Sequence, residues 1–259
     1  MQLDELKYLI LGQDYKINDN IIIHNPTIAE ISEFGEFNYL ALINYIVMRP
    51  YDDMVNLWDE GIDYETVSDF ELFIRNVLSL GFTRQYSSII FGDLDFSTFD
   101  VSVNPQNEEL IITNGEVVID RNIYQQIVDY IRFINYIDSE IQNEIKPGSL
   151  ATKKYLIKRM RRKQEFNAKK ERKQHIASLV SSLVNIPNTN YSYEGVMGLH
   201  ISQLYDSFYR VMKRDNSHYV KQAIYGGTIS AKDVDNSVLE WFGSISKQNK
   251  EKEKRRDDT

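Results

Sequence analysis

Apolar residues recur at three- and four-residue spacing through most of residues 25–81, which predicts helices. Asn25 followed by Pro26 is typical of a helix start, with the asparagine as N-cap and the proline in the first helical position. The segment 39–47 is almost entirely apolar and stops before Pro50, as expected of a core helix, because the residue before a proline disfavours the helical conformation. Two further amphipathic helices are expected over residues 54–58 and 70–78.

Between residues 86 and 120 apolar and polar residues alternate with a period of two, which predicts short strands. The expected strands cover residues 88–91, 99–103, 109–113 and 116–119. Asn114 and Gly115 lie between the last two and favour a type I′ turn, in which both central residues need positive φ. An earlier hairpin is predicted from residues 15–17 and 21–24, joined by a short turn rich in Asn and Asp.

The second half of the chain is predicted to contain a long αα-hairpin. Asp120 or Asn122 is expected to cap its first helix. A heptad-like seam follows, formed by Ile127, Tyr130, Ile134, Ile137 and Ile141. Pro147 and Gly148 break this helix, and Ser149 is placed to cap a second helix that continues to Asn185, about 50 Å long at 1.5 Å per residue.

Residues 201–225 read as another amphipathic helix ended by Gly226 and Gly227, with a short helix after it. The pattern therefore predicts a predominantly helical α+β fold: an N-terminal helical region with small β-hairpins, the long αα-hairpin with an exposed basic arm, and a C-terminal helical bundle. We expect an acidic α+β domain over residues 1–121 and a helical domain over 122–246 that contains the basic helix 150–185. Residues 247–259 are highly charged and are expected to form a disordered tail.

Charge changes this picture because it is unevenly distributed. Residues 1–152 carry 26 acidic and 8 basic side chains, whereas residues 153–173 carry 11 basic and 2 acidic ones. The basic helix also has few apolar residues between Met160 and Ile176, so its middle cannot pack on a core. The sequence thus predicts an acidic body with a solvated basic arm.

Candidate chemistry is sparse, and we expect no catalytic residues, no cofactor, no metal and hence no enzyme. The chain has no cysteine, its four histidines are scattered, and it contains no phosphate-binding glycine loop and no nucleophile elbow. Asp93 and Asp95 could share one face of a strand and hold a cation, but a solvated strand face or turn explains this spacing better. No segment has the roughly 18 consecutive apolar residues of a membrane span, and the absence of cysteine favours folding in a cytosol.

The basic arm is the strongest candidate for a binding site. The residues predicted to bind a partner are Lys158, Arg159, Arg161, Arg162, Lys163, Lys169, Lys170, Arg172 and Lys173. Such a charge density attracts an acidic protein surface, whether of a partner or of the acidic body itself. Nucleic acid is the alternative, although only Tyr155, Phe166 and two amide side chains are available for base contacts and the acidic body would repel a polyanion. A merely solvated helix is the third interpretation.

Three runs of residues resemble a known class of proteins. Residues 23–31, Phe34-Gly35-Glu36 and residues 57–63 are similar to the start of tail-morphogenesis proteins from tailed phages of Gram-positive hosts. Residues 225–229 and Trp241-Phe242 are similar to the ends of phage baseplate or tail assembly factors. About a third of the chain carries this resemblance.

The resemblance implies a non-enzymatic assembly factor, either a chaperone or a minor structural component of the tail or baseplate. Its partners would be other phage tail or baseplate proteins. It would be made in the cytoplasm of the bacterial host, with the virion tail as a second location. The alternative function is that of a nucleic-acid-binding accessory protein that uses the basic helix.

Overall fold

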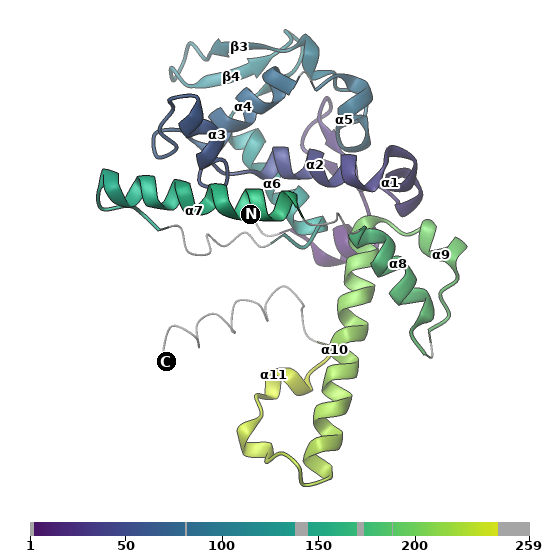
Figure 1. Ribbon diagram of the computed structural model, residues 1–259. Coiled ribbons are helices and arrows are strands. Elements are labelled where there is room, and N and C mark those ends of the chain that lie inside the picture. The colour runs from purple at the N-terminus through teal and green to yellow at the C-terminus, as the bar shows by residue number, and fades with distance from the viewer. Residues whose placement is uncertain (1–2, 81, 138–144, 170–173, 188, 243–259) are drawn as a thin grey trace.

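The computed structural model describes residues 3–80, 82–137, 145–169, 174–187 and 189–242, and shows a predominantly helical α+β protein with two small antiparallel sheets. Figure 1 shows a helical body from which one long helix, α10, projects away. None of the described helices combines the length and the apolar character that crossing a membrane requires.

The N-terminal helices form most of the body. They are the short π-helix η1 (Leu6–Ile10), then α1 (Ile28–Phe34), α2 (Glu36–Val47), α3 (Met54–Asp59), α4 (Asp69–Leu80) and α5 (Arg84–Phe91). α2, α3 and α4 lie where the apolar spacing predicts helices. Ser68 and Glu71 form reciprocal side-chain to backbone hydrogen bonds at the start of α4, which satisfy amide groups that the first helical turn leaves unpaired.

Two of the predictions for this region are wrong. α1 starts two residues later than Asn25-Pro26 suggests, because Thr27 and Glu30 form the capping box instead. Residues 88–91 are not a strand but the last turn of α5, which buries Ser87, Ile90 and Phe91 on one helical face. A short apolar run fits a strand and a buried helix equally well, so its period alone could not decide.

The strands confirm both predicted hairpins. They are β1 (Tyr15–Lys16) and β2 (Ile22–Ile23) in one sheet, with β3 (Asp100–Val103), β4 (Leu110–Thr113) and β5 (Val118–Ile119) in the other, and a 3-10 turn, η2 (Phe96–Thr98), precedes β3. The prediction of a type I′ turn is wrong, because Thr113 pairs with Val118 and the loop between them has four residues. In this loop Gly115 has φ 91° while the Asn114 side chain accepts hydrogen bonds from the amides of Glu116 and Val117.

The predicted αα-hairpin is wrong in the part of it that the structure describes. α6 (Arg121–Ile134) begins at the expected cap, Asp120, but ends at Ile134. Tyr136 then adopts φ 54°, so the chain has left the helix before Ile137. Ile141, the last residue of the predicted seam, lies outside the described residues.

The single helix predicted from Ser149 to Asn185 is two helices. α7 (Leu150–Ala168) begins at Ser149, whose hydroxyl accepts a hydrogen bond from the amide of Thr152, and α8 (His175–Asn185) begins after Gln174, which is extended. α7 packs on α3, whereas α8 packs on α10 and on α9 (Tyr193–Met197). Because α7 and α8 pack on different elements, they cannot be parts of one straight helix.

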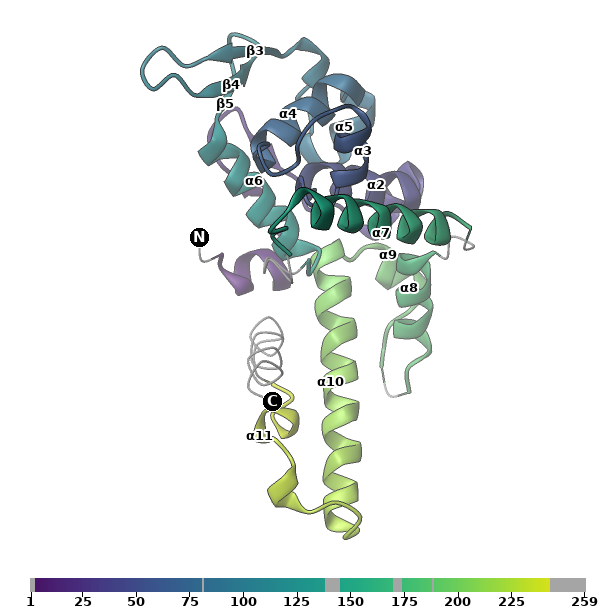
Figure 2. The ribbon, with the colours of Figure 1, turned by 60° about the vertical axis from the view of Figure 1, so that its left-hand side comes forward.

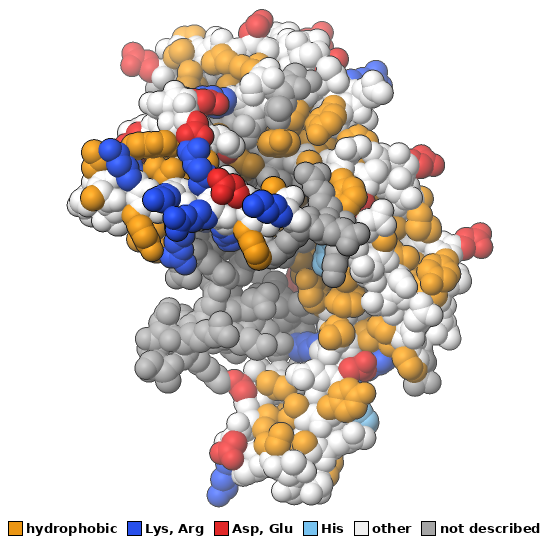
Figure 3. Space-filling model, in the orientation of Figure 1, with side chains coloured by type: hydrophobic (Ala, Val, Ile, Leu, Met, Phe, Trp, Pro, Cys, Tyr) orange, Lys and Arg blue, Asp and Glu red, His pale blue; other side chains and the backbone are white. Residues whose placement is uncertain are grey.

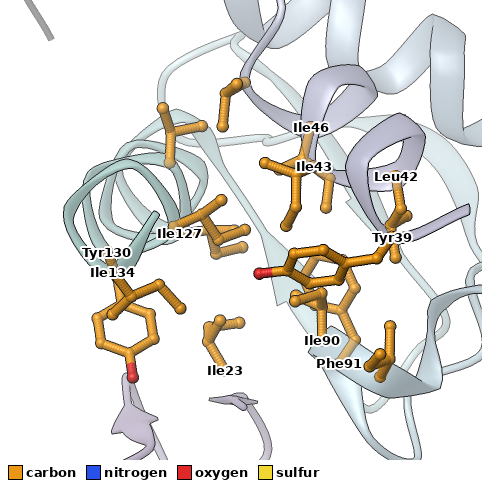
Figure 4. Packing of buried hydrophobic residues seen from close by; sticks show 14 of the residues in the cluster. Ile23, Tyr39, Leu42, Ile43, Ile46, Ile90, Phe91, Ile127, Tyr130 and Ile134 are labelled. Carbon is orange, nitrogen blue, oxygen red and sulfur yellow. The ribbon is translucent and has the colours of Figure 1, made fainter. Parts of the chain in front are cut away.

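One main core joins the first half of the chain to the second. α2 packs against both α4 and α6, and the side chains of Tyr39, Ile127 and Ile134 are fully buried between them (Figure 4). The same cluster continues into α8 and the first turns of α10. The packing therefore continues across the predicted domain boundary at residue 121, and the division into two domains stays a prediction.

The C-terminal part consists of α8, α9, α10 (Ile201–Tyr225), η3 (Ala231–Asp233) and α11 (Asn236–Leu239). As predicted, α10 is one helix that ends at Gly226 and Gly227. Backbone hydrogen bonds from Ile201 to Pro26 and from Ile28 to Leu199 fasten its first turn to the body. Its far half extends beyond the body in both ribbon views, with α11 beside it (Figure 2).

Candidate protein-docking surface on α7

α7 has two faces with different chemistry. Leu156 and Ile157 are buried and Met160 is half-buried, so one side of the helix packs on the body. Tyr155, Lys158, Arg159 and Arg162 occupy the opposite side at helical spacing and are exposed. The sequence produces this division because apolar residues occur at i, i+1 and i+4 within a run of cations.

The inner face docks on a small apolar cluster that is separate from the main core. α3, the segment after it and one side of α4 contribute Met54, Val55, Leu57, Tyr64 and Leu72. Burying a leucine or isoleucine side chain stabilises by about 1.5–3 kcal/mol, so Leu156 and Ile157 hold α7 on the body.

Ion pairs flank this apolar contact at both ends. Near the start of α7, the Lys153 ammonium donates to both carboxylate oxygens of Asp63 at 2.8 Å, pairs with Glu65 and lies 5.3 Å from the centre of the Tyr64 ring. Two turns further on, a guanidinium nitrogen of Arg161 lies 2.5 Å from Asp59. The hydrogen bonds from Lys153 to Asp63 and Glu65 raise the pKa of Lys153, which favours its charged form.

The predicted partner-binding residues are therefore divided. Arg161 faces the body, whereas Lys158, Arg159, Arg162, Lys163 and Lys169 are exposed. Among the described residues, no carboxylate pairs with Lys158, Arg159, Arg162 or Lys163. Lys170, Arg172 and Lys173 lie outside the described residues. Figure 3 shows the blue side chains gathered along α7, with apolar side chains among them.

Two aromatic residues complete the outer face. The side chains of Tyr155 and Phe166 are 65% and 63% exposed. The sequence analysis identified these two aromatic residues. It did not predict that Asp59, Asp63 and Glu65 pair with the cations on the inner face of α7. Their position before α4 gave no signal, because only folding brings them against α7.

The body also has a cleft, which no residue of α7 lines. A cleft of about 950 Å³ opens between the β1–β2 hairpin, α1, the end of α5 and the β4–β5 loop. Carboxylates dominate its polar lining: Asp14, Asp19, Glu30, Glu33, Asp93, Asp95 and Glu116. Asp93 pairs with Arg84, and Asp95 accepts a hydrogen bond from the amide of Ser97 at the start of η2. The two carboxylates therefore do not share one face of a strand, as the cation site considered from the sequence would require. Within the described residues no group of three or more His, Asp or Glu side chains has the geometry of a metal site.

His24 bridges two carboxylates at the edge of this cleft. Its Nδ1 lies 2.9 Å from Asp14 and its Nε2 lies 3.4 Å from Glu30. The hydrogen bond to Asp14 outweighs the effect of burial and raises the pKa of His24. Because Asp14 also accepts from the amide of Asn25, this group fixes the junction at which α10 is fastened to the body.

Comparison with known proteins concerns the C-terminal part. A family model described as the second domain of YomV matches residues 167–246, from the end of α7 to just beyond α11. That family is of Bacillus phage type, so this segment relates the chain to phage proteins. No curated protein matches the sequence, and no solved structure matches it.

Proposed function

We propose that this protein is a non-enzymatic phage assembly factor that binds other virion proteins through the outer face of α7. The single observation that carries the proposal is the exposed basic and aromatic face on a helix whose other face is already satisfied by the body. Four cations of this face, Lys158, Arg159, Arg162 and Lys163, are exposed and pair with no carboxylate among the described residues, so they are available for a partner of opposite charge.

The relation of residues 167–246 to a Bacillus phage-type family supports the phage context. The resemblance of residues 23–31 and 225–229 to tail-morphogenesis and baseplate assembly proteins extends the proposal to the tail. On this proposal the protein acts in the host cytoplasm during tail or baseplate assembly, as a chaperone or a minor component.

One observation favours a second candidate function. Tyr155 and Phe166 lie among the cations of α7, and exposed aromatic rings beside cations are also used to stack nucleic-acid bases. A nucleic-acid-binding accessory protein is therefore the alternative.

The test is partner capture from cells that express the phage genes. Wild-type protein and a variant with Lys158, Arg159, Arg162 and Lys163 replaced by Gln are cross-linked in the cells, purified and analysed by mass spectrometry. Arg161 stays in place because it holds the helix to Asp59. We expect virion proteins with the wild type and a loss of about tenfold or more with the variant.

A matched control removes the same number of positive charges elsewhere, with Arg121, Lys146, Lys221 and Lys232 replaced by Gln. This control should retain the partners. Equal capture by the two variants would show that α7 is not the docking surface. Nuclease-sensitive capture, with binding to duplex DNA that falls steeply with salt, would instead support the nucleic-acid alternative.

A further inference from the structure

We propose that the projecting half of α10 is a self-association element, which packs in parallel against the same half of α10 in a second copy of the protein. The surface uses no residue of α7, so it is separate from the one on which the proposed assembly function rests. The spacing of exposed residues along α10, one polar residue within that spacing, the position of α11 and the charge of the region support this assignment.

A stripe of residues at heptad spacing follows the projecting half of α10. The members of this α10 stripe are Tyr209, Met212, Asn216, Tyr219 and Ala223, which follow one another at intervals of three, four, three and four residues. Two helices that carry such a stripe can wind around each other as a coiled coil. Met212 and Tyr219 are 53% and 67% exposed, so the large apolar side chains of the stripe face solvent. Apolar side chains gather on the projecting part of the molecule in Figure 3.

The α10 stripe lies beside faces of the helix that already have partners. At its start, the ring of Tyr209 packs on that of Tyr136, so the stripe begins where α10 leaves the body. On one side α11 packs along the helix, and the buried hydroxyl of Ser217 donates a hydrogen bond to the carbonyl of Leu239. Asn216, the neighbour of Ser217 in sequence, is exposed. The far half of α10 extends beyond the body in both ribbon views, where a helix of another molecule can reach it (Figure 2).

Asn216 indicates which helix fits the stripe. In the heptad it occupies an a position, and Met212 and Tyr219 occupy the flanking d positions. An unrelated apolar helix would bury the Asn216 amide without a hydrogen-bond partner, which is unfavourable. In a parallel pair of identical helices in register, the two Asn216 amides face each other and can form a hydrogen bond, as polar residues at a positions do in two-stranded coiled coils. A second copy of this chain therefore satisfies the whole stripe.

The charge of the region allows two copies to approach each other. Residues 209–242, which include the far half of α10 and α11, carry five basic and four acidic side chains. The opposite signs nearly balance, so repulsion between two copies is small. The α10 stripe is about 21 Å long from Tyr209 to Ala223. Because so short a pair of helices buries little surface, we expect a reversible dimer of modest affinity.

Disulfide cross-linking of the full-length protein tests the parallel register, because the chain itself contains no cysteine. Met212→Cys introduces a thiol at a d position, and Lys221→Cys introduces one at an f position, on the opposite side of the helix. Only at the d position does a parallel pair bring the two thiols within reach of a disulfide. We expect the covalent dimer to form about tenfold or more faster with Met212→Cys than with Lys221→Cys.

Sedimentation equilibrium of the full-length protein measures the association itself. Replacing both Met212 and Tyr219 by Glu places charges inside the contact and should weaken dimerisation about tenfold or more. Lys221→Glu is the control and should leave dimerisation unchanged. Asn216→Leu removes the polar residue and should strengthen association, because a buried Asn costs stability in return for register. Circular dichroism should show the same melting temperature for the monomer of each variant, since these positions lie outside the main core.

A wild-type protein that stays monomeric at about 1 mM, where even a millimolar Kd would be evident, overturns the proposal. A dimer that the two glutamates leave intact overturns it as well, and so does equal cross-linking at Met212 and Lys221. Replacing the four exposed cations of α7 by Gln should leave the dimer unchanged. Loss of partner capture through α7 and loss of self-association through α10 are therefore separate outcomes.

Discussion

α6 and α7 follow one another in the sequence, yet they are held in different ways. Both begin at a residue whose side chain accepts a hydrogen bond from an amide of the first turn, Asp120 in α6 and Ser149 in α7. α6 then buries residues on several sides, with Ile127 and Ile134 fully inside the main core. α7 buries a single narrow stripe around Leu156 and Ile157 and exposes the rest.

The difference shows that a cap decides where a helix starts but not how firmly it is held. α6 is fixed by contacts with α2 and α10 and with strand β5, whereas α7 packs on α3. Fewer buried apolar side chains mean a smaller free energy of local opening. The outer surface of α7 can thus be altered with less effect on the fold than that of α6, a property suited to a docking element.

The largest effect is expected in α6. Replacing Ile127 by Ala leaves a cavity in the main core and should lower the free energy of unfolding by about 2–5 kcal/mol. Urea denaturation followed by circular dichroism measures this change. A loss below 1 kcal/mol would mean that the main core around α6 is loosely packed and that the comparison with α7 does not hold.

A smaller and more local effect is expected in α7. Replacing Ile157 by Ala should cost about 2 kcal/mol or less, because this residue lies in the satellite cluster at the edge of the body. Hydrogen exchange of the amides should increase within residues 150–168 and remain unchanged in α6. Exchange that rises equally in both helices would show that α7 unfolds only with the whole protein.

Much of this contrast could be predicted from the sequence. The density of cations after Met160 and the scarcity of apolar residues there indicated a solvated helix, and residues 162–169 are exposed. The first half of α7 instead packs on the body through Leu156 and Ile157, which the prediction of a solvated arm did not include. The continuous helix to Asn185 was wrong because the pattern on both sides of Gln174 is helical, and no proline or glycine marks the break. Breaks that tertiary packing imposes leave no local signal.

The division of the basic residues between two faces was harder to predict. Arg161 and Arg162 are neighbours in sequence, yet Arg161 pairs with Asp59 and Arg162 is exposed. Helical spacing places them about 100° apart, but only the position of α3 determines which one meets a carboxylate. The residues of the site were thus available from the sequence, whereas their orientation required the fold.

A pH-dependent effect should separate the body from α7. His24 has a raised pKa in the folded protein because of its hydrogen bond to Asp14, so its protonation favours folding. This stabilisation is complete below the unfolded pKa of about 6.5 and is lost as the pH rises through the folded value above it. Unfolding measured from pH 5 to pH 9 should therefore show a decline in stability that a His24→Asn variant lacks. A profile identical in both proteins would exclude this role of His24, and exchange in α7 should not follow the decline.

The smallest effect on stability is expected from the outer face. With Lys158, Arg159, Arg162 and Lys163 replaced by Gln, the free energy of unfolding should change by no more than about 0.5 kcal/mol, since these side chains have no carboxylate partner among the described residues. Replacing Lys153 and Arg161 by Gln instead removes the ion pairs with Asp63 and Asp59, and should increase hydrogen exchange in α7. The two variants change the same helix but opposite faces. If the outer variant opens α7 as much as the inner one does, the outer cations contribute to the fold and α7 is not a surface reserved for a partner.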